Sequence, residues 1–269
     1  MEQDSLLQKL KFALTETEKP SVFFEQCREQ NKLDIFPELK ALIGIPQSEA
    51  WHQEGDAWTH TMMVLDEASL FSGQSSDKFG FMMAALCHDF GKAVCTETIN
   101  GKTHALKHEI ESVPLTEQFL ERLPLDSDQK EYIVNLVALH MKPHHAYDNQ
   151  SHIKKTNQMF FEAKSPEDLV LLAVADTSGK LPRVGIAEEK EFLLNRLAVF
   201  QEYMQRPYVT DKDILNMGVR KDTLQYEAVT AYAHKLRMAG VNKEDALKQT
   251  SRYAEKGWNK ERKDSVKER

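Results

Sequence analysis

Residues 84–92, AALCHDFGK, place a histidine and an aspartate directly after an apolar run. The pattern over residues 79–90 predicts a buried helix that ends at Gly91, because glycine is common just past a helix C-terminus. A buried, ionised carboxylate is strongly unfavourable unless a cation or hydrogen-bond donors compensate for its lost hydration. His88 and Asp89 therefore indicate that a charged partner lies at the end of this helix.

Polar side chains also interrupt the apolar faces of three other predicted helices. His60, His140 and Asp176 lie on the apolar faces predicted at 58–71, 129–141 and 166–176. One buried histidine is common, but two buried carboxylates together with several imidazoles share one economical explanation, a divalent metal ion. The partial negative charge of a helix C-terminus also favours a cation beside His88 and Asp89.

The composition predicts an all-α fold. The chain of 269 residues holds only 11 Gly and 9 Pro, and helix-forming residues dominate it. Further helices are expected at 5–13, 22–29, 109–123, 153–162, 187–204, 211–217, 221–239 and 243–256, and Asn100-Gly101 marks a loop or small hairpin. Pro207 is the predicted boundary between a helical bundle at 1–205 and a smaller helical tail at 206–269.

The charge is unevenly distributed along the chain. Residues 206–269 contain 15 Lys/Arg and 10 Asp/Glu, whereas the whole chain carries a net charge of −7. The basic tail therefore predicts either a polyanionic partner, such as RNA, or merely a solvated helical surface.

Two absences in the sequence favour the cytoplasm. We see no signal peptide and no apolar segment of about 18 residues that could cross a membrane. The three cysteines, Cys27, Cys87 and Cys95, form no CxxC pair and leave one odd thiol, which fits a reducing compartment.

The ordered set His60, His88-Asp89 and Asp176, with HDFGK at its centre, resembles the HD-domain metal-dependent phosphohydrolase superfamily. Residues 22–200 also resemble the HD domain of bacterial CCA-adding enzymes (tRNA nucleotidyltransferases), through FPEL, GIPQ and WHQEGD before the first ligand and HALKHE, ALH and VADTSGK after it. Those enzymes carry a nucleotidyltransferase head, and no such pattern precedes residue 22 here. We therefore expect no CCA addition.

The resemblance implies an HD-domain helical bundle that hydrolyses nucleotide phosphoesters. The expected activities are those of a 2′,3′-cyclic phosphodiesterase, a 2′-nucleotidase and a phosphatase, performed by a metal-bound hydroxide. His60, His88, Asp89 and Asp176 would hold the first divalent ion, which the ligand types allow to be Mn, Ni, Fe, Co, Zn or Mg. Asp89 is thus expected to be catalytic as well as metal-binding.

Other residues allow two roles each. His108 and His140 would either complete a second metal site, with Asp89 bridging the ions, or bind phosphate and orient the other ligands. Lys92 would place a point charge on the substrate phosphate, or would only pair with the helix dipole. His104 is a weaker substrate-binding candidate, and His144 would line the entrance to the site or lie exposed in a loop.

Two rival functions remain open at the level of sequence. Some HD-fold proteins hold two irons and activate oxygen, and the six-residue ligand order would suit such a di-iron oxygenase. Alternatively, the chain would be a non-catalytic protein whose HD domain and basic tail bind RNA, including tRNA.

Overall fold

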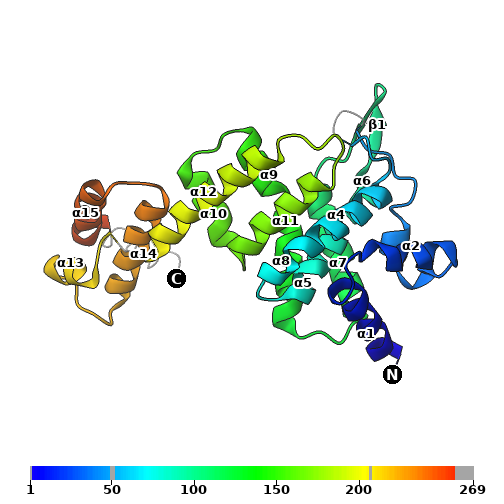
Figure 1. Cartoon of the computed structure of the whole chain (residues 1–269). Coiled ribbons are helices and arrows are strands. Elements are labelled where there is room, and N and C mark those ends of the chain that lie inside the picture. Colours follow the sequence, from blue (N-terminus) through cyan, green and yellow to red (C-terminus); the bar gives the residue numbers. More distant parts are fainter. Residues whose placement is uncertain (1, 49–51, 206–207, 258–269) are drawn as a thin grey trace. The chain divides into compact units, whose positions relative to one another are not determined.

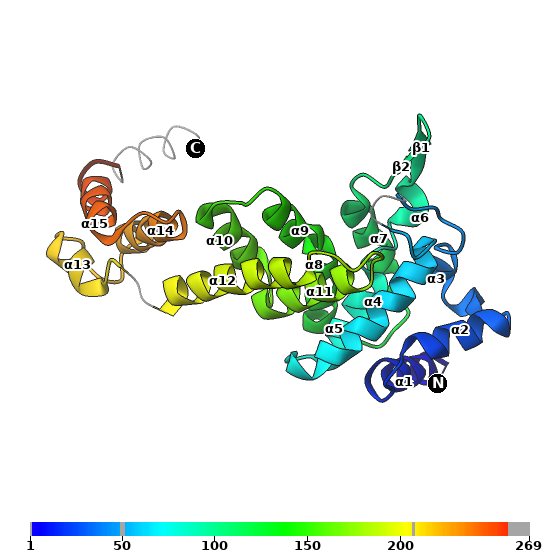
Figure 2. The ribbon, with the colours of Figure 1, turned by 45° about the horizontal axis from the view of Figure 1, so that its top comes forward.

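The computed structural model describes residues 2–48, 52–205 and 208–257. The chain forms two compact units, one of residues 1–149 and 161–194, the other of residues 150–160 and 195–269. Both units are helical, and a two-stranded hairpin is the one sheet within the described ranges (Figures 1 and 2). The prediction of an all-α fold is therefore confirmed.

The first unit contains the elements that later form the candidate site. They are α1 (Glu2–Thr15), α2 (Ser21–Glu29), η1 (Leu33–Ile35), α3 (Pro37–Lys40), α4 (Ala57–Phe71), η2 (Ser72–Gln74), α5 (Lys78–Cys87), α6 (Lys92–Cys95), β1 (Glu97–Ile99), β2 (Lys102–His104), α7 (His108–Glu121), α8 (Ser127–Leu139), α9 (Met141–Asp148), α11 (Pro166–Ser178) and the first part of α12 (Ile186–Gln205). Helix α4 packs against α5 and α11, and α8 packs against α5 and α7.

Side-chain caps begin the central helices of this unit. The carboxylate of Asp56 accepts a hydrogen bond from the backbone N–H of Thr59 at the start of α4. Asp77 and Asp126 cap α5 and α8 in the same way, and Ser165 caps α11. Each cap satisfies a backbone donor that the helix itself cannot pair, so these four residues fix where the site-forming helices begin.

An aromatic cluster holds the HDFGK segment in place. Phe90 packs edge-on against Phe119 of α7 with 5.8 Å between ring centroids, and Phe119 packs against Phe36 at 6.2 Å. Phe36 in turn contacts Phe24 of α2 at 5.7 Å. All four rings are fully buried. The residue after Asp89 is thus anchored in the core by contacts that reach back to the start of the chain.

Gly91 has a different role from the one predicted. Helix α5 ends at Cys87, and Gly91 has a right-handed φ of −62° at the start of α6 rather than the left-handed conformation of a helix stop. The residue must be glycine because a Cβ there would lie 2.1 Å from the carbonyl oxygen of His108. Close packing of this turn on α7, reinforced by a 2.8 Å hydrogen bond from the Gly91 N–H to Ser112 Oγ, replaces the expected cap.

The structure also decides the predictions for the Asn100-Gly101 turn and for the segment around His144. Asn100 and Gly101 both adopt positive φ and join β1 to β2, which confirms the hairpin alternative. The segment around His144, considered as a possible loop, is instead helix α9. Pro143 lies within the first turn of α9, where its missing N–H costs no helical hydrogen bond. The other helices are present, with ends that differ by a few residues from those predicted.

The second unit has a core of its own. It contains α10 (Ile153–Glu162) except for its last residues, the end of α12, α13 (Asp211–Asn216), α14 (Leu224–Met238), α15 (Lys243–Arg252) and the π-helical turn η3 (Tyr253–Gly257). Its buried cluster is made of Val209, Ile214, Val219, Val229, Ala233, Leu236, Ala246 and Ala254. The predicted boundary residue, Pro207, lies outside the described residues, and the contacts divide the chain within α12.

The close approach at Gly91 gives a direct test of the fold. We expect Gly91→Ala to lower the free energy of unfolding by at least about 2 kcal/mol, because the new methyl group meets backbone that cannot move aside. Gly73→Ala is the matched control, since no described atom lies within 4 Å of the Cβ position there. Urea unfolding of both variants measures the difference, and equal stabilities would contradict the packing role of Gly91.

Candidate metal centre

Six buried side chains from separate elements converge in the first unit. They are His60 in α4, His88 at the C-cap of α5, Asp89 in the following turn, His108 at the start of α7, His140 at the C-cap of α8 and Asp176 in α11. Each is less than a tenth exposed. The structure therefore brings together all six residues that the sequence predicted as metal ligands.

Three of these residues form one candidate ligand set. His60, His88 and Asp176 each offer one atom, and these atoms lie within 4.8 Å of one another. His60 Nε2 lies 3.1 Å from Asp176 Oδ1. Two imidazole nitrogens and a carboxylate oxygen are suitable ligands for a borderline divalent ion.

Asp89, His108 and His140 form a second set of the same kind. Asp89 Oδ1 lies 3.2 Å from His108 Nε2 and 3.9 Å from His140 Nε2. The other oxygen, Oδ2, lies 3.2 Å from His88 Nε2 and 3.5 Å from His60 Nε2. Asp89 thus presents one oxygen to each set, which is the arrangement expected of a carboxylate that bridges two ions.

Backbone carbonyl groups orient three of the imidazoles. The Nδ1 atoms of His88, His108 and His140 each lie 2.7–2.8 Å from the carbonyl oxygen three residues earlier. A carbonyl oxygen only accepts hydrogen bonds, so each Nδ1 carries the proton and each Nε2 offers a lone pair toward the centre. This repeated contact explains why the histidines sit at helix ends.

A carboxylate performs the same task for His60. Glu54 Oε1 lies 3.0 Å from His60 Nδ1 and accepts a 2.6 Å hydrogen bond from His52 Nδ1. Its other oxygen accepts a hydrogen bond from the backbone N–H of Leu181. Burial alone would raise the pKa of Glu54, but the contacts with His52, His60 and Leu181 hold it far below its usual range. Glu54 is therefore charged and fixes the orientation of His60.

Most of the nitrogen and oxygen atoms at the centre of this cluster do not form hydrogen bonds with one another. Among the described residues, His60 Nε2 and His88 Nε2 are buried without a hydrogen-bond partner. Asp89 Oδ2 and Asp176 Oδ1 face them and make no well-aligned hydrogen bond, although the ammonium groups of Lys92 and Lys180 lie 2.6 Å and 3.1 Å away. The Nε2 atoms of His108 and His140 lie 3.1 Å apart, and both are lone-pair donors when their Nδ1 atoms are protonated. Buried acceptors that face one another require a cation between them, so these residues fit divalent metal ions.

The protonation states agree with a metal-binding role. Burial would raise the pKa values of Asp89 and Asp176, but their neighbours, His88 and Lys92 for Asp89 and Lys180 and His144 for Asp176, hold both well below their usual range. Burial and the nearby His108 lower the pKa of His140. Charged carboxylates and a neutral imidazole are the forms that bind metal ions.

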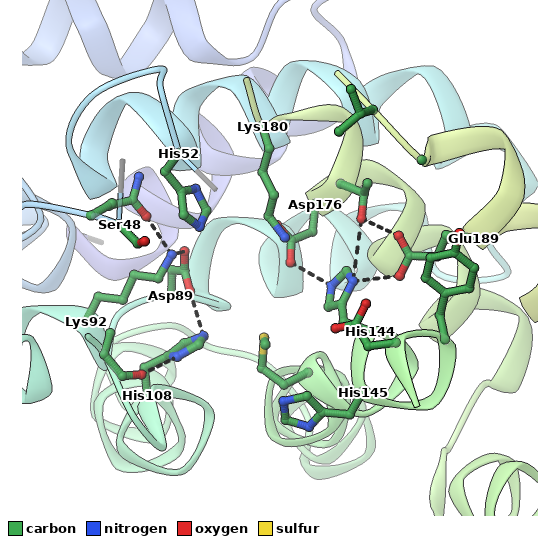
Figure 3. A pocket seen from close by; sticks show the side chains of 18 of the residues that line it. Ser48, His52, Asp89, Lys92, His108, His144, His145, Asp176, Lys180 and Glu189 are labelled. Carbon is green, nitrogen blue, oxygen red and sulfur yellow. Dashed lines mark hydrogen bonds and ion pairs between the residues drawn. The ribbon is translucent and has the colours of Figure 1, made fainter. Parts of the chain in front are cut away.

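A cavity of about 520 Å³ opens beside this cluster. Figure 3 shows Asp89 and Asp176 with Lys92, Lys180 and His144 around them. Lys92 Nζ lies 2.6 Å from Asp89 Oδ2 and donates to Gln47 Oε1, also at 2.6 Å. The structure therefore places the Lys92 ammonium group at the cavity wall, in contact with Asp89.

His144 is buried in the cavity wall, not exposed in a loop. Its Nε2 lies 2.8 Å from Asp176 Oδ2, and its Nδ1 lies 2.7 Å from Glu189 Oε1. Burial and the nearby Lys180 lower its pKa, but the carboxylates of Asp176 and Glu189 outweigh them and raise it to about 9. His144 is therefore a positively charged imidazolium at neutral pH, which donates from both nitrogens.

His104 is less well placed than the sequence suggested. It lies exposed at the end of β2, and the cavity is lined by its neighbours Thr103 and Ala105 instead. Strand alternation explains this, since adjacent side chains on a strand point to opposite faces. The geometry offers no support for substrate binding by His104.

Sequence reasoning missed three charged residues of the site: Glu54, Lys180 and Glu189. Lys180 could have been found, because it lies four residues after Asp176, one helical turn further on, in the same VADTSGK segment. Glu54 lies in the quoted WHQEGD segment, but no helical pattern there indicated its direction. Glu189 carries no local signal, since only the tertiary fold places α12 beside His144.

Comparison with known proteins gives a consistent picture. The HD-domain family model matches residues 57–178. The multifunctional CCA protein of Pasteurella multocida is 31% identical over 229 residues, which are 79% of this chain and 52% of that protein. The protein of the same name from Shewanella denitrificans is 35% identical over 133 residues, 49% of this chain and 31% of the relative. The chain thus spans about half the length, or less, of these curated relatives.

The matched region coincides with the candidate metal centre. It begins three residues before His60, contains the His88-Asp89 pair and ends two residues after Asp176. None of the described helices is both long and apolar enough to cross a membrane. Since the family match and the buried His and Asp residues occupy the same helices, residues 57–178 of this chain form an HD domain, and the HD-domain superfamily consists generally of metal-dependent hydrolases.

Proposed function

We propose that this protein hydrolyses phosphoesters of nucleotides, with 2′,3′-cyclic nucleotides, 2′-nucleotides and phosphate monoesters as candidate substrates. The observation that carries the proposal is the position of Asp89, which offers one oxygen to each of two histidine sets beside a cavity of about 520 Å³. Similarity to multifunctional CCA proteins supports a nucleotide or an RNA end as the phosphoester.

The ligands are assigned by their grouping. His60, His88 and Asp176 would hold one ion, His108 and His140 the other, and Asp89 both. When bound, such ions lower the pKa of water and offset charge on phosphoryl oxygens. Nitrogen and carboxylate ligands suit Mn, Ni, Fe, Co, Zn or Mg, and a single ion in the first set is the minimal form of the proposal.

The remaining charged residues set the charge of the cavity that would hold the substrate. Lys92 is held by Gln47 and Asp89, so its ammonium group is fixed at the cavity wall where it can contact a phosphoryl oxygen. His144 donates from both nitrogens to Asp176 and Glu189, so it offsets the charge of these carboxylates beside the cavity rather than hydrogen-bonding to the substrate itself. Positioned charges of this kind stabilise an anionic phosphoryl group more strongly in a buried site than in water.

RNA binding by the tail is a secondary candidate with weaker support. Residues 206–269 contain 15 Lys/Arg and 10 Asp/Glu, but the described residues 208–257 contain nine and seven. The larger part of the tail's excess positive charge therefore lies outside the described residues. A small phosphoester therefore remains the favoured partner.

The cysteines are free thiols, and Cys27 and Cys87 are buried. Free thiols support the cytoplasm as the compartment of this protein.

Replacement of Asp89 tests the proposed activity. We expect Asp89→Asn, in the presence of Mn²⁺, to lower the rate of 2′,3′-cyclic AMP hydrolysis by at least about a thousandfold, because a neutral amide cannot serve both histidine sets. Phosphorus NMR of the substrate and product measures the rate. His104→Ala is the matched control, since it removes an exposed histidine outside the cavity lining and should leave the rate unchanged.

Two results would contradict the assignment in different ways. Unchanged hydrolysis by Asp89→Asn would show that the candidate metal centre takes no part in the reaction. Bound iron with oxygen uptake, and no phosphoester hydrolysis by the wild-type protein, would favour the di-iron oxygenase instead.

Metal binding should also stabilise the fold. Ligand that binds only the folded state at a hundred times its Kd adds about 2.7 kcal/mol to the free energy of unfolding. We therefore expect Mn²⁺ to raise the Tm of the wild-type protein, EDTA to reverse the shift, and His88→Ala to reduce it. His152→Ala, which removes an exposed histidine outside the cavity lining, should retain the full shift. An identical shift in His88→Ala would mean that Mn²⁺ binds elsewhere.

A further inference from the structure

Two lysines approach the metal-binding carboxylates in the same manner. Lys92 lies three residues after Asp89 and contacts its Oδ2, and Lys180 lies four residues after Asp176 and contacts its Oδ1 at 3.1 Å. These two oxygens also face His60 Nε2, at 3.5 Å and 3.1 Å. Both ammonium groups therefore bind the carboxylate atoms that point toward the candidate metal site.

Lys180 has more remaining hydrogen-bonding capacity than Lys92. An ammonium group has three donors. Lys92 uses two of them, on Asp89 and Gln47, and its side chain is 8% exposed. The ammonium group of Lys180 has Asp176 as its one partner among the described residues, and its side chain is 21% exposed and lines the cavity. Lys180 can thus accept a further anionic partner from the cavity.

The backbone places Lys180 there for a specific reason. Gly179 ends α11, and a Cβ at this position would lie 2.6 Å from Val64 Cγ2 and 2.9 Å from Val64 N in α4. The absence of a side chain lets the end of α11 approach the helix that carries His60. The Lys180 ammonium therefore reaches the same space as the metal-binding residues (Figure 3).

The Lys180 ammonium group needs an anionic partner once a divalent ion is bound at Asp176. A divalent ion on Asp176 Oδ1 would repel the Lys180 ammonium group, which carries a like charge at short range. An anion that contacts both would offset that repulsion. A phosphoryl group is suitable, because its several oxygens can contact a metal ion and an ammonium group together.

We infer that Lys180 binds the phosphoryl group of the substrate, as a second phosphate-binding lysine together with Lys92. This inference rests on the proposed function and deepens it, because it assigns the recognition of phosphate to the cavity face formed by α11. The alternative is that Lys180 only balances the charge of Asp176, and the two roles predict different binding behaviour.

Calorimetry with Mn²⁺ and then with inorganic phosphate separates these roles. In Lys180→Met, which retains side-chain length without charge, we expect Mn²⁺ to bind with unchanged stoichiometry. Phosphate binding to the Mn²⁺-loaded protein should weaken by about tenfold or more, the loss typical of a charged hydrogen bond. Lys180→Arg should bind phosphate more tightly than Lys180→Met. The matched control is Lys164→Met, which removes a lysine that pairs with Glu131 at 2.7 Å outside the cavity.

Wild-type phosphate affinity in Lys180→Met would overturn the inference, and so would a loss of Mn²⁺ binding in a variant with a wild-type Tm. Failure of the proposed function looks different. In that case the wild-type protein would hydrolyse no phosphoester, whatever the affinity of the Lys180 variants for phosphate.

Discussion

Burial of two carboxylates beside four histidines is the constraint on which the rest of this structure depends. Asp89 and Asp176 are almost fully enclosed, and each remains charged only because cations surround it. Lys92, Lys180 and His144 supply part of that compensation from the chain itself. The unpaired nitrogen and oxygen atoms between the carboxylates and the histidines show where further positive charge is needed.

The surrounding fold is arranged to hold these groups at fixed directions. Backbone carbonyl groups orient three histidines, and the Glu54 carboxylate orients the fourth. Glycines at 91 and 179 allow neighbouring helices to approach within distances that any side chain would prevent. Five of the six candidate ligands therefore lie in helices or at their caps, and Asp89 lies in the buried turn directly after α5, which is the fixed placement that a preorganised metal site requires.

Much of the fold could be predicted from helical periodicity, and the candidate ligands from periodicity together with the resemblance to HD-domain enzymes. His60, His140 and Asp176 were recognisable as polar residues on apolar helix faces, and the adjacent pair His88-Asp89 completed the pattern. Gly91 was misinterpreted, since glycine serves equally as a helix stop and as a site of close packing. The burial of His144 could not be foreseen, because it depends on Glu189, which lies 45 residues away along the chain.

The central claim is that the two histidine sets, joined by Asp89, bind divalent ions. Anomalous diffraction from crystals grown with Mn²⁺ tests it most directly. The account predicts one anomalous peak among His60, His88 and Asp176 and a second among His108 and His140, with Asp89 contacting both. Crystals that contain Mn²⁺ elsewhere, with Lys92 and Lys180 still bound to the two carboxylates, would contradict it.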